Sequence, residues 1–86
     1  MSEIRSFRFA SEEGVYFDAY IGNEERSFFL DIAILEDMSK YKVIRDKAKA
    51  EMALYSIRTE IKRMCQLVVN KNPKWPAEQT LPLSRL

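Results

Sequence analysis

The apolar residues of this 86-residue chain change their spacing near residue 32, and this change constrains the fold more than any other feature. Before it, apolar and polar residues alternate, as in Val15, Phe17, Ala19 and Ile21. After it, apolar residues recur at intervals of three and four. Alternation is typical of a half-buried strand, and the longer intervals are typical of an amphipathic helix. The sequence therefore predicts strands followed by helices, an α+β domain.

The first half of the chain predicts a three-stranded antiparallel β-meander. Alternating patterns cover residues 7–9, 15–21 and 28–32. Both glycines, Gly14 and Gly22, fall in the stretches between them, where a turn benefits from a residue that tolerates positive φ. Short turns join neighbouring strands in antiparallel order.

The second half predicts a short helix and then one long helix packed on one face of the sheet. The short helix contains Ile34, Leu35 and Met38, and Asp31 is its expected N-cap. The long helix is expected over residues 43–69. Its apolar stripe consists of Val43, Ala50, Leu54, Ile57, Ile61, Met64, Cys65 and Val68.

A proline-containing segment follows the long helix. The motif NKNP at residues 70–73 predicts the helix end, because proline disfavours helical geometry in the residue before it. Two more prolines and the absence of a regular period predict an extended C-terminal tail. We therefore expect one α+β domain over residues 1–72 and a tail over residues 73–86.

The residue types argue against an enzyme. The chain has no histidine, which excludes Ser-His-Asp and Cys-His nucleophilic sites. Cys65 lies on the apolar stripe and is expected to be a buried, unreactive thiol. Carboxylate pairs such as Glu12-Glu13 and Glu36-Asp37 lie in expected turns or at a helix end, where no apolar pocket surrounds them, and they are expected to be solvated charges. We expect no catalytic residue, no metal site and no cofactor.

The single cysteine is also relevant to the cellular compartment of the protein. It cannot form an intramolecular disulfide, the staple that small secreted domains commonly use. The chain starts with polar and charged residues, and no segment approaches the length of a membrane span. These features predict a cytoplasmic protein with no membrane partner.

Some apolar residues are left over once the core is assigned, and they predict a protein–protein interface. Met52 and Tyr55 lie on a weaker apolar strip roughly opposite the main stripe, with Ile44 near its start. Phe29 points away from the core side of its strand, and Trp75 lies between prolines. The partner is either a second copy, giving a homodimer, or another protein. The alternatives are that Tyr16 or Tyr20 covers Phe29, that Trp75 caps the chain's own core, and that the short helix or the tail, through Trp75, Leu81 or Leu83, covers Met52 and Tyr55.

Charge is distributed unevenly although the net charge is only +1. Residues 1–40 carry four basic and nine acidic groups, whereas residues 41–86 carry ten basic and four acidic groups. The alternative function is therefore a nucleic-acid-binding accessory protein that uses the basic side of the long helix. The candidate residues are Lys42, Arg45, Lys49 and Arg63. A pocket for a small apolar ligand between sheet and helix is a third possibility, for which only the aromatic content argues.

The run GVYFDAYIGNEERSFFLDIAILED, residues 14–37, followed by AKAEMALYSIRTEIKRMC, resembles the DUF1488 family of small bacterial proteins. The positions that correspond are Gly22, Leu35, Glu36, Arg58 and Ile61. The resemblance covers about half of the chain and rests mostly on hydrophobic pattern. The chain departs from the family in its tail and in lacking a tryptophan ahead of the strands. The resemblance implies a compact meander with helices and carries over no catalytic residue.

Overall fold

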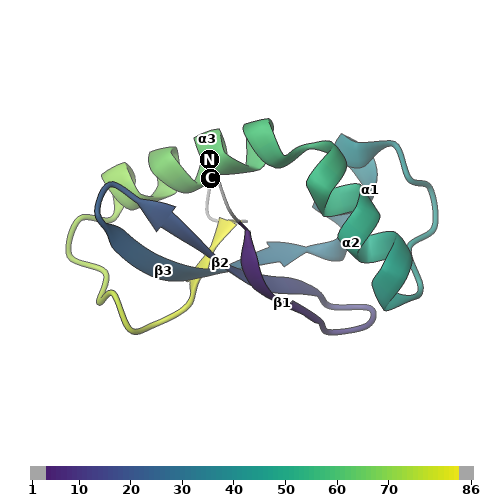
Figure 1. The fold of residues 1–86 in the computed structure, drawn as a ribbon, viewed down its shortest axis with the longest axis horizontal. Helices are drawn as coiled ribbons and strands as arrows, with labels where there is room; N and C mark the ends of the chain where they lie inside the picture. Colours follow the sequence, from purple (N-terminus) through teal and green to yellow (C-terminus); the bar gives the residue numbers. More distant parts are fainter. Residues whose placement is uncertain (1–3, 84–86) are drawn as a thin grey trace.

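The computed structural model of the protein describes residues 4–83 and shows an α+β fold with a mixed four-stranded sheet (Figure 1). The elements follow in the order β1 (Arg5–Phe9), β2 (Gly14–Ile21), β3 (Glu24–Asp31), α1 (Ile32–Ser39), α2 (Lys47–Ser56), α3 (Arg58–Lys71) and β4 (Leu81–Pro82). The predicted meander and the change from strands to helices are confirmed. No helix within residues 4–83 is long and apolar enough to cross a membrane.

The sheet has the strand order β1-β2-β3-β4. Strand β2 pairs antiparallel with β3 along its whole length, from Gly14 opposite Asp31 to Ile21 opposite Glu24. The prediction of a purely antiparallel, three-stranded sheet is wrong in one respect, because β4 from the expected tail pairs parallel with β3. This strand is only two residues long and has no detectable period, so its pairing depends on the β3 edge and not on a local pattern.

Helix α1 begins where β3 ends, and the predicted N-cap is confirmed. The Asp31 carboxylate accepts a hydrogen bond from the Ala33 backbone N–H at 2.8 Å. At the other end, Lys40 adopts a left-handed conformation and its N–H donates to the Glu36 carbonyl at 3.1 Å. The chain thus turns from strand into helix with local hydrogen bonds at both ends of α1 and one long-range bond, in which the Ile32 N–H donates to the Glu13 carbonyl at 3.0 Å.

The predicted long helix is present over most of its range, but it is divided at Ile57. This residue has φ −120° and ψ 26°, and its N–H donates to the Leu54 carbonyl. A straight helix over residues 47–71 would be about 37 Å long at 1.5 Å per residue. The longest dimension of the molecule is 34 Å. A bend allows both halves to stay over the sheet while the apolar spacing continues without interruption.

The start of the predicted long helix is corrected as well. Residues 40–46 form a loop, and α2 begins after Asp46, whose carboxylate accepts the Lys49 N–H at 2.8 Å. Val43, expected in the core, is 50% exposed, while Ile44, expected outside, is buried. Helical spacing does not apply in this loop. Its conformation is held by the Glu36 carboxylate, which accepts the Ile44 N–H at 2.9 Å.

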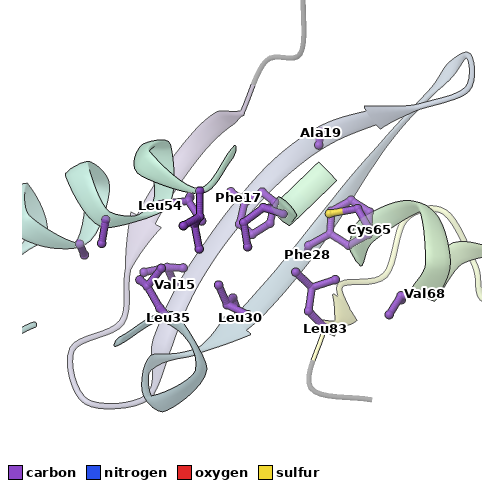
Figure 2. Packing of buried hydrophobic residues seen from close by; sticks show 14 of the residues in the cluster. Val15, Phe17, Ala19, Phe28, Leu30, Leu35, Leu54, Cys65, Val68 and Leu83 are labelled. Carbon is purple, nitrogen blue, oxygen red and sulfur yellow. The ribbon is translucent and has the colours of Figure 1, made fainter. Parts of the chain in front are cut away.

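One hydrophobic core lies between the sheet and the helices (Figure 2). Phe17 and Phe28 stack at its centre with ring centroids 5.7 Å apart. Leu35, Leu54 and Cys65 reach this core from α1, α2 and α3 respectively. All three helices therefore lie on the same side of the sheet, as Figure 1 shows for α2 and α3.

The segment expected as an extended tail also contributes to this core. Leu81 and Leu83 are buried in it, and Trp75 packs against it. The Arg26 guanidinium, whose side chain is 12% exposed, donates to the Trp75 carbonyl at 3.3 Å. The question whether the tail docks on its own domain is therefore decided for residues up to 83: it does.

Candidate functional site

The outer face of the sheet, opposite the helices, is the clearest candidate site. On β2, the side chains that alternate with buried Val15, Phe17 and Ala19 belong to Tyr16, Asp18 and Tyr20. Their register partners on β3 share this face, and they are Phe29, Ser27 and Glu25 respectively. This outer face, as we call it from here on, also includes Arg5 and Arg8 of β1.

An aromatic pair occupies the middle of the outer face. Tyr16 and Phe29 are directly opposite each other on β2 and β3, and their ring centroids are 4.8 Å apart at an interplanar angle of 50°. Both side chains are half-buried by their neighbours. The expectation that Tyr16 partly covers Phe29 is confirmed. Such cross-strand aromatic pairs stabilise a sheet by about 0.2–1 kcal/mol.

A β-bulge in β1 brings two arginines onto the same face. Arg5 is opposite Asp18 and Arg8 is opposite Tyr16, so three steps along β1 match two steps along β2. Ser6 absorbs the extra residue with φ 52°. In a regular strand, residues three positions apart point to opposite faces. The bulge is thus the reason that both guanidinium groups lie beside the aromatic rings.

Each arginine is placed over a tyrosine ring. The Arg5 Cζ lies 5.6 Å from the Tyr20 ring centroid, and the Arg8 Cζ lies 5.8 Å from that of Tyr16. These distances are within the range of cation–π attraction. Tyr20 nevertheless remains 45% exposed. The outer face therefore presents aromatic surface bordered by positive charge along β1.

Negative charge on the outer face comes from Asp18 on β2 and Glu25 on β3. The Asp18 carboxylate accepts the Ser27 hydroxyl at 2.7 Å and lies 3.8 Å from the Arg8 guanidinium. Glu25, on β3, is exposed and has no ion pair with any of the residues described. The face thus combines an apolar centre, a basic side along β1 and an acidic residue on β3.

The four residues predicted as a protein interface lie in three places. Phe29 belongs to the outer face. Met52 and Tyr55 lie on α2, 59% and 38% exposed, and the tail leaves them uncovered because Leu81 and Leu83 are in the core. The Tyr55 hydroxyl donates to the Ile4 carbonyl at 3.0 Å.

Trp75, the fourth residue of that set, lies in the loop between α3 and β4. Its indole N–H donates to the Gln79 carbonyl at 3.3 Å, and its ring packs against the core. A shallow hollow of about 460 Å³ surrounds it, lined by residues of the same loop. This placement matches the alternative in which Trp75 caps the chain's own core.

The four residues predicted for nucleic-acid binding are all exposed. Lys42 and Arg45 lie in the loop before α2, Lys49 lies on α2, and Arg63 lies on α3. The prediction placed them on one side of a continuous helix. Because this region is a loop and two helices, the four residues do not lie on one continuous helix.

Cys65 is buried at the centre of α3, as expected. Desolvation raises the pKa of its thiol to about 12, against a smaller opposing effect of a backbone hydrogen bond. At neutral pH the group is protonated and is a poor nucleophile. Within residues 4–83, no group of three or more acidic or thiol side chains is arranged to hold a metal ion.

An open cleft of about 520 Å³ lies at the other end of the sheet. It lies between the β1–β2 turn, α1 and the loop before α2, and its lining includes Glu12, Glu36 and Arg45. The Glu36 carboxylate already accepts the Ile44 N–H. This cleft is partly polar and lies beside the core, so it differs from the apolar pocket between sheet and helix that the aromatic content suggested.

Sequence reasoning missed the two arginines of the outer face. Arg5 and Arg8 differ by three positions, which in a regular strand would separate them, and a bulge at Ser6 has no clear signal in RSFRF. Tyr16 and Tyr20 were expected only as cover for Phe29. Their alternation with apolar residues was the signal that placed them on the outer side.

Comparisons of the chain with protein-family models, curated proteins and solved structures found no match. The resemblance to the DUF1488 family stays a prediction.

Proposed function

We propose that the protein is a small, non-enzymatic protein-interaction module that self-associates through the outer face of its sheet. The observation that carries this proposal is the aromatic surface of Tyr16, Tyr20 and Phe29 on the side of the sheet that no helix packs against. Aromatic residues and arginines are the types enriched at the centres of protein interfaces. The absence of histidine from the chain and the buried, protonated Cys65 support a role other than catalysis.

A second copy fits this face because its charges are self-complementary. The basic side lies along β1, and the exposed acidic Glu25 lies on β3. A two-fold axis parallel to the strands places the β1 side of one copy over the β3 side of its partner. Arg5, whose guanidinium lies over Tyr20, would then approach Glu25 of the other copy, while the aromatic pairs meet near the axis. Two sheets that pack face to face are about 10 Å apart, a distance that these side chains fill.

The test compares two variants that place the same negative charge on opposite layers. Tyr20→Glu changes the outer face, and Met52→Glu changes the exposed side of α2. Sedimentation velocity and light scattering over a range of protein concentrations give the dimer dissociation constant. We expect a dimer for the unchanged protein and for Met52→Glu, and a dissociation constant raised at least ~10-fold for Tyr20→Glu.

Two outcomes would overturn the proposal. A chain that remains monomeric at every concentration rules out self-association. A dimer that is broken by Met52→Glu and not by Tyr20→Glu moves the interface to α2, the patch that the leftover apolar residues predicted. Circular dichroism of both variants checks that each retains the native helix content.

A further inference from the structure

The helix layer carries a surface that the proposed dimer leaves free. Helix α3 has four basic residues and one acidic residue, and all five are exposed. The basic residues are Arg58, Lys62, Arg63 and Lys71. We propose that the outward side of α3 is a docking surface for the phosphate backbone of a nucleic-acid duplex.

The first argument is that these positive charges are not neutralised within the protein. Both ion pairs among the described residues are formed by residues of the sheet, Arg8 with Asp18 and Arg26 with Glu24. Within residues 4–83, Lys62, Arg63 and Lys71 have no ion pair. At 3.6 residues per turn, Arg63 lies on the outward side of α3, and Lys62 and Lys71 lie on its two flanks. Unpaired cations on the exposed sides of one helix attract a polyanion and release its counterions when it binds.

The second argument is the chemistry along the outward side of the helix. Ile61, Cys65 and Val68 turn into the core, so the positions opposite them face solvent. Those positions are Thr59, Arg63, Gln66 and Asn70, spaced at four, three and four, and all are exposed. Each side chain carries a hydrogen-bond donor, and such side chains commonly contact phosphate and sugar oxygens.

The same features favour a duplex over the other polyanions. A helix that binds a membrane surface uses a broad apolar face, whereas Ile61, Cys65 and Val68 of α3 are buried in the core and Leu67, 46% exposed, is a single apolar side chain on the exposed side. Single strands are held by aromatic side chains on which bases stack, and the outward side of α3 has none. Fourteen helical residues extend about 21 Å, comparable to six base-pair steps of a duplex.

The test uses two double variants that change the net charge by the same amount. Lys62→Glu/Arg63→Glu alters α3, and Arg5→Glu/Arg8→Glu alters the sheet. Fluorescence anisotropy with a labelled DNA duplex of about 12 base pairs at low salt gives the affinity. We expect the unchanged full chain to bind the duplex, and the α3 variant to bind it at least ~10-fold more weakly. If three cations reach phosphates, a plot of the logarithm of the binding constant against the logarithm of the salt concentration has a slope of about −3.

The sheet variant separates this inference from the proposed dimer. It should bind the short duplex within ~3-fold of the unchanged chain while its dimer weakens, since the two surfaces are on opposite layers. If both variants lose the same amount of affinity for the duplex, binding depends on net charge alone, and the assignment of the surface to α3 is overturned. Absence of duplex binding at low salt would overturn it too, as would binding confined to vesicles of anionic lipid. None of these results depends on whether the chain self-associates.

Discussion

Of the two glycines, Gly14 is the one whose position leaves no room for a side chain. It is buried at the start of β2 with φ +155°, and a Cβ added there would lie 2.2 Å from the Leu30 carbonyl oxygen and 2.9 Å from the Phe29 ring. The first contact is with backbone, which cannot move without opening the β2–β3 pairing. Gly22 also has a positive φ, +69°, but its surroundings are open.

We therefore expect Gly14→Ala to lower the free energy of unfolding by about 3 kcal/mol or more, because steric overlap adds to backbone strain. Gly22→Ala, the matched control, should cost only about 1–2 kcal/mol through its left-handed backbone. Urea denaturation followed by circular dichroism measures both. Equal costs for the two substitutions would contradict the close approach at Gly14.

Cys65 gives the stability a pH dependence whose sign follows from its surroundings. Burial raises the pKa of the thiol from 9.0 to about 12 in the folded chain. Between these values the unfolded chain has lost the proton and the folded chain retains it. Stability that is fully present below pH 9 is therefore lost as the pH rises toward 12.

We expect the free energy of unfolding to fall by up to about 1.4 kcal/mol per pH unit above pH 9 through this group. Cys65→Ala removes the thiol, so the difference between the two chains isolates its effect from that of tyrosine and lysine titration. Urea denaturation at pH 8, 9 and 10 measures it. Parallel declines for both chains would show that the thiol is accessible to solvent in the folded state.

The junctions between helices and strands determine the arrangement of the surfaces as much as the helices and strands themselves do. The bulge in β1 sets which side chains share the outer face, and the bend at Ile57 keeps α2 and α3 over one sheet. Short strand β4 joins residues far apart in the chain, since Leu81 pairs with Phe28. Each of these three junctions changes which side chains share a surface, and none of them alters the apolar spacing of the adjoining segments.

A substitution in strand β4 tests whether residues 73–83 contribute to the stability of the core. We expect Leu81→Ala to lower the free energy of unfolding by about 2–4 kcal/mol, because it removes a buried side chain and leaves a cavity. Glu78→Ala, at an exposed position of the preceding loop, should change it by no more than about 0.5 kcal/mol. Thermal and urea denaturation measure both. A small effect of Leu81→Ala would mean that residues 73–83 dock only loosely on the domain.

At the scale of the whole molecule, charge is divided between two layers. The strands and turns over residues 4–31 carry three basic and six acidic groups, while α2 and α3 carry six basic and two acidic groups. A dimer formed through the outer faces would leave both helix layers exposed on opposite sides. The two proposed surfaces are therefore compatible, and the charge-reversal pairs on sheet and helix separate them experimentally.

Elements that depend on local pattern could be predicted before the structure was known. Alternation placed the three antiparallel strands and their inward side chains, and Asp31 marked the start of α1, because neighbouring residues alone set these features. The same alternation showed that Phe29 faces away from the core, and the spacing of the helices placed Cys65 within it.

Features that depend on residues distant in the chain became visible only in the folded molecule. The apolar stripe continues through Ile57, so its spacing does not reveal that the helix is divided at this residue. Ile44 is buried through a hydrogen bond to Glu36, and β4 exists because β3 offers an open edge. Arg5 and Arg8 share a face because a bulge shifts the strand register. Pairing across the sheet and packing against it are long-range interactions, and a periodicity read along one segment does not contain them.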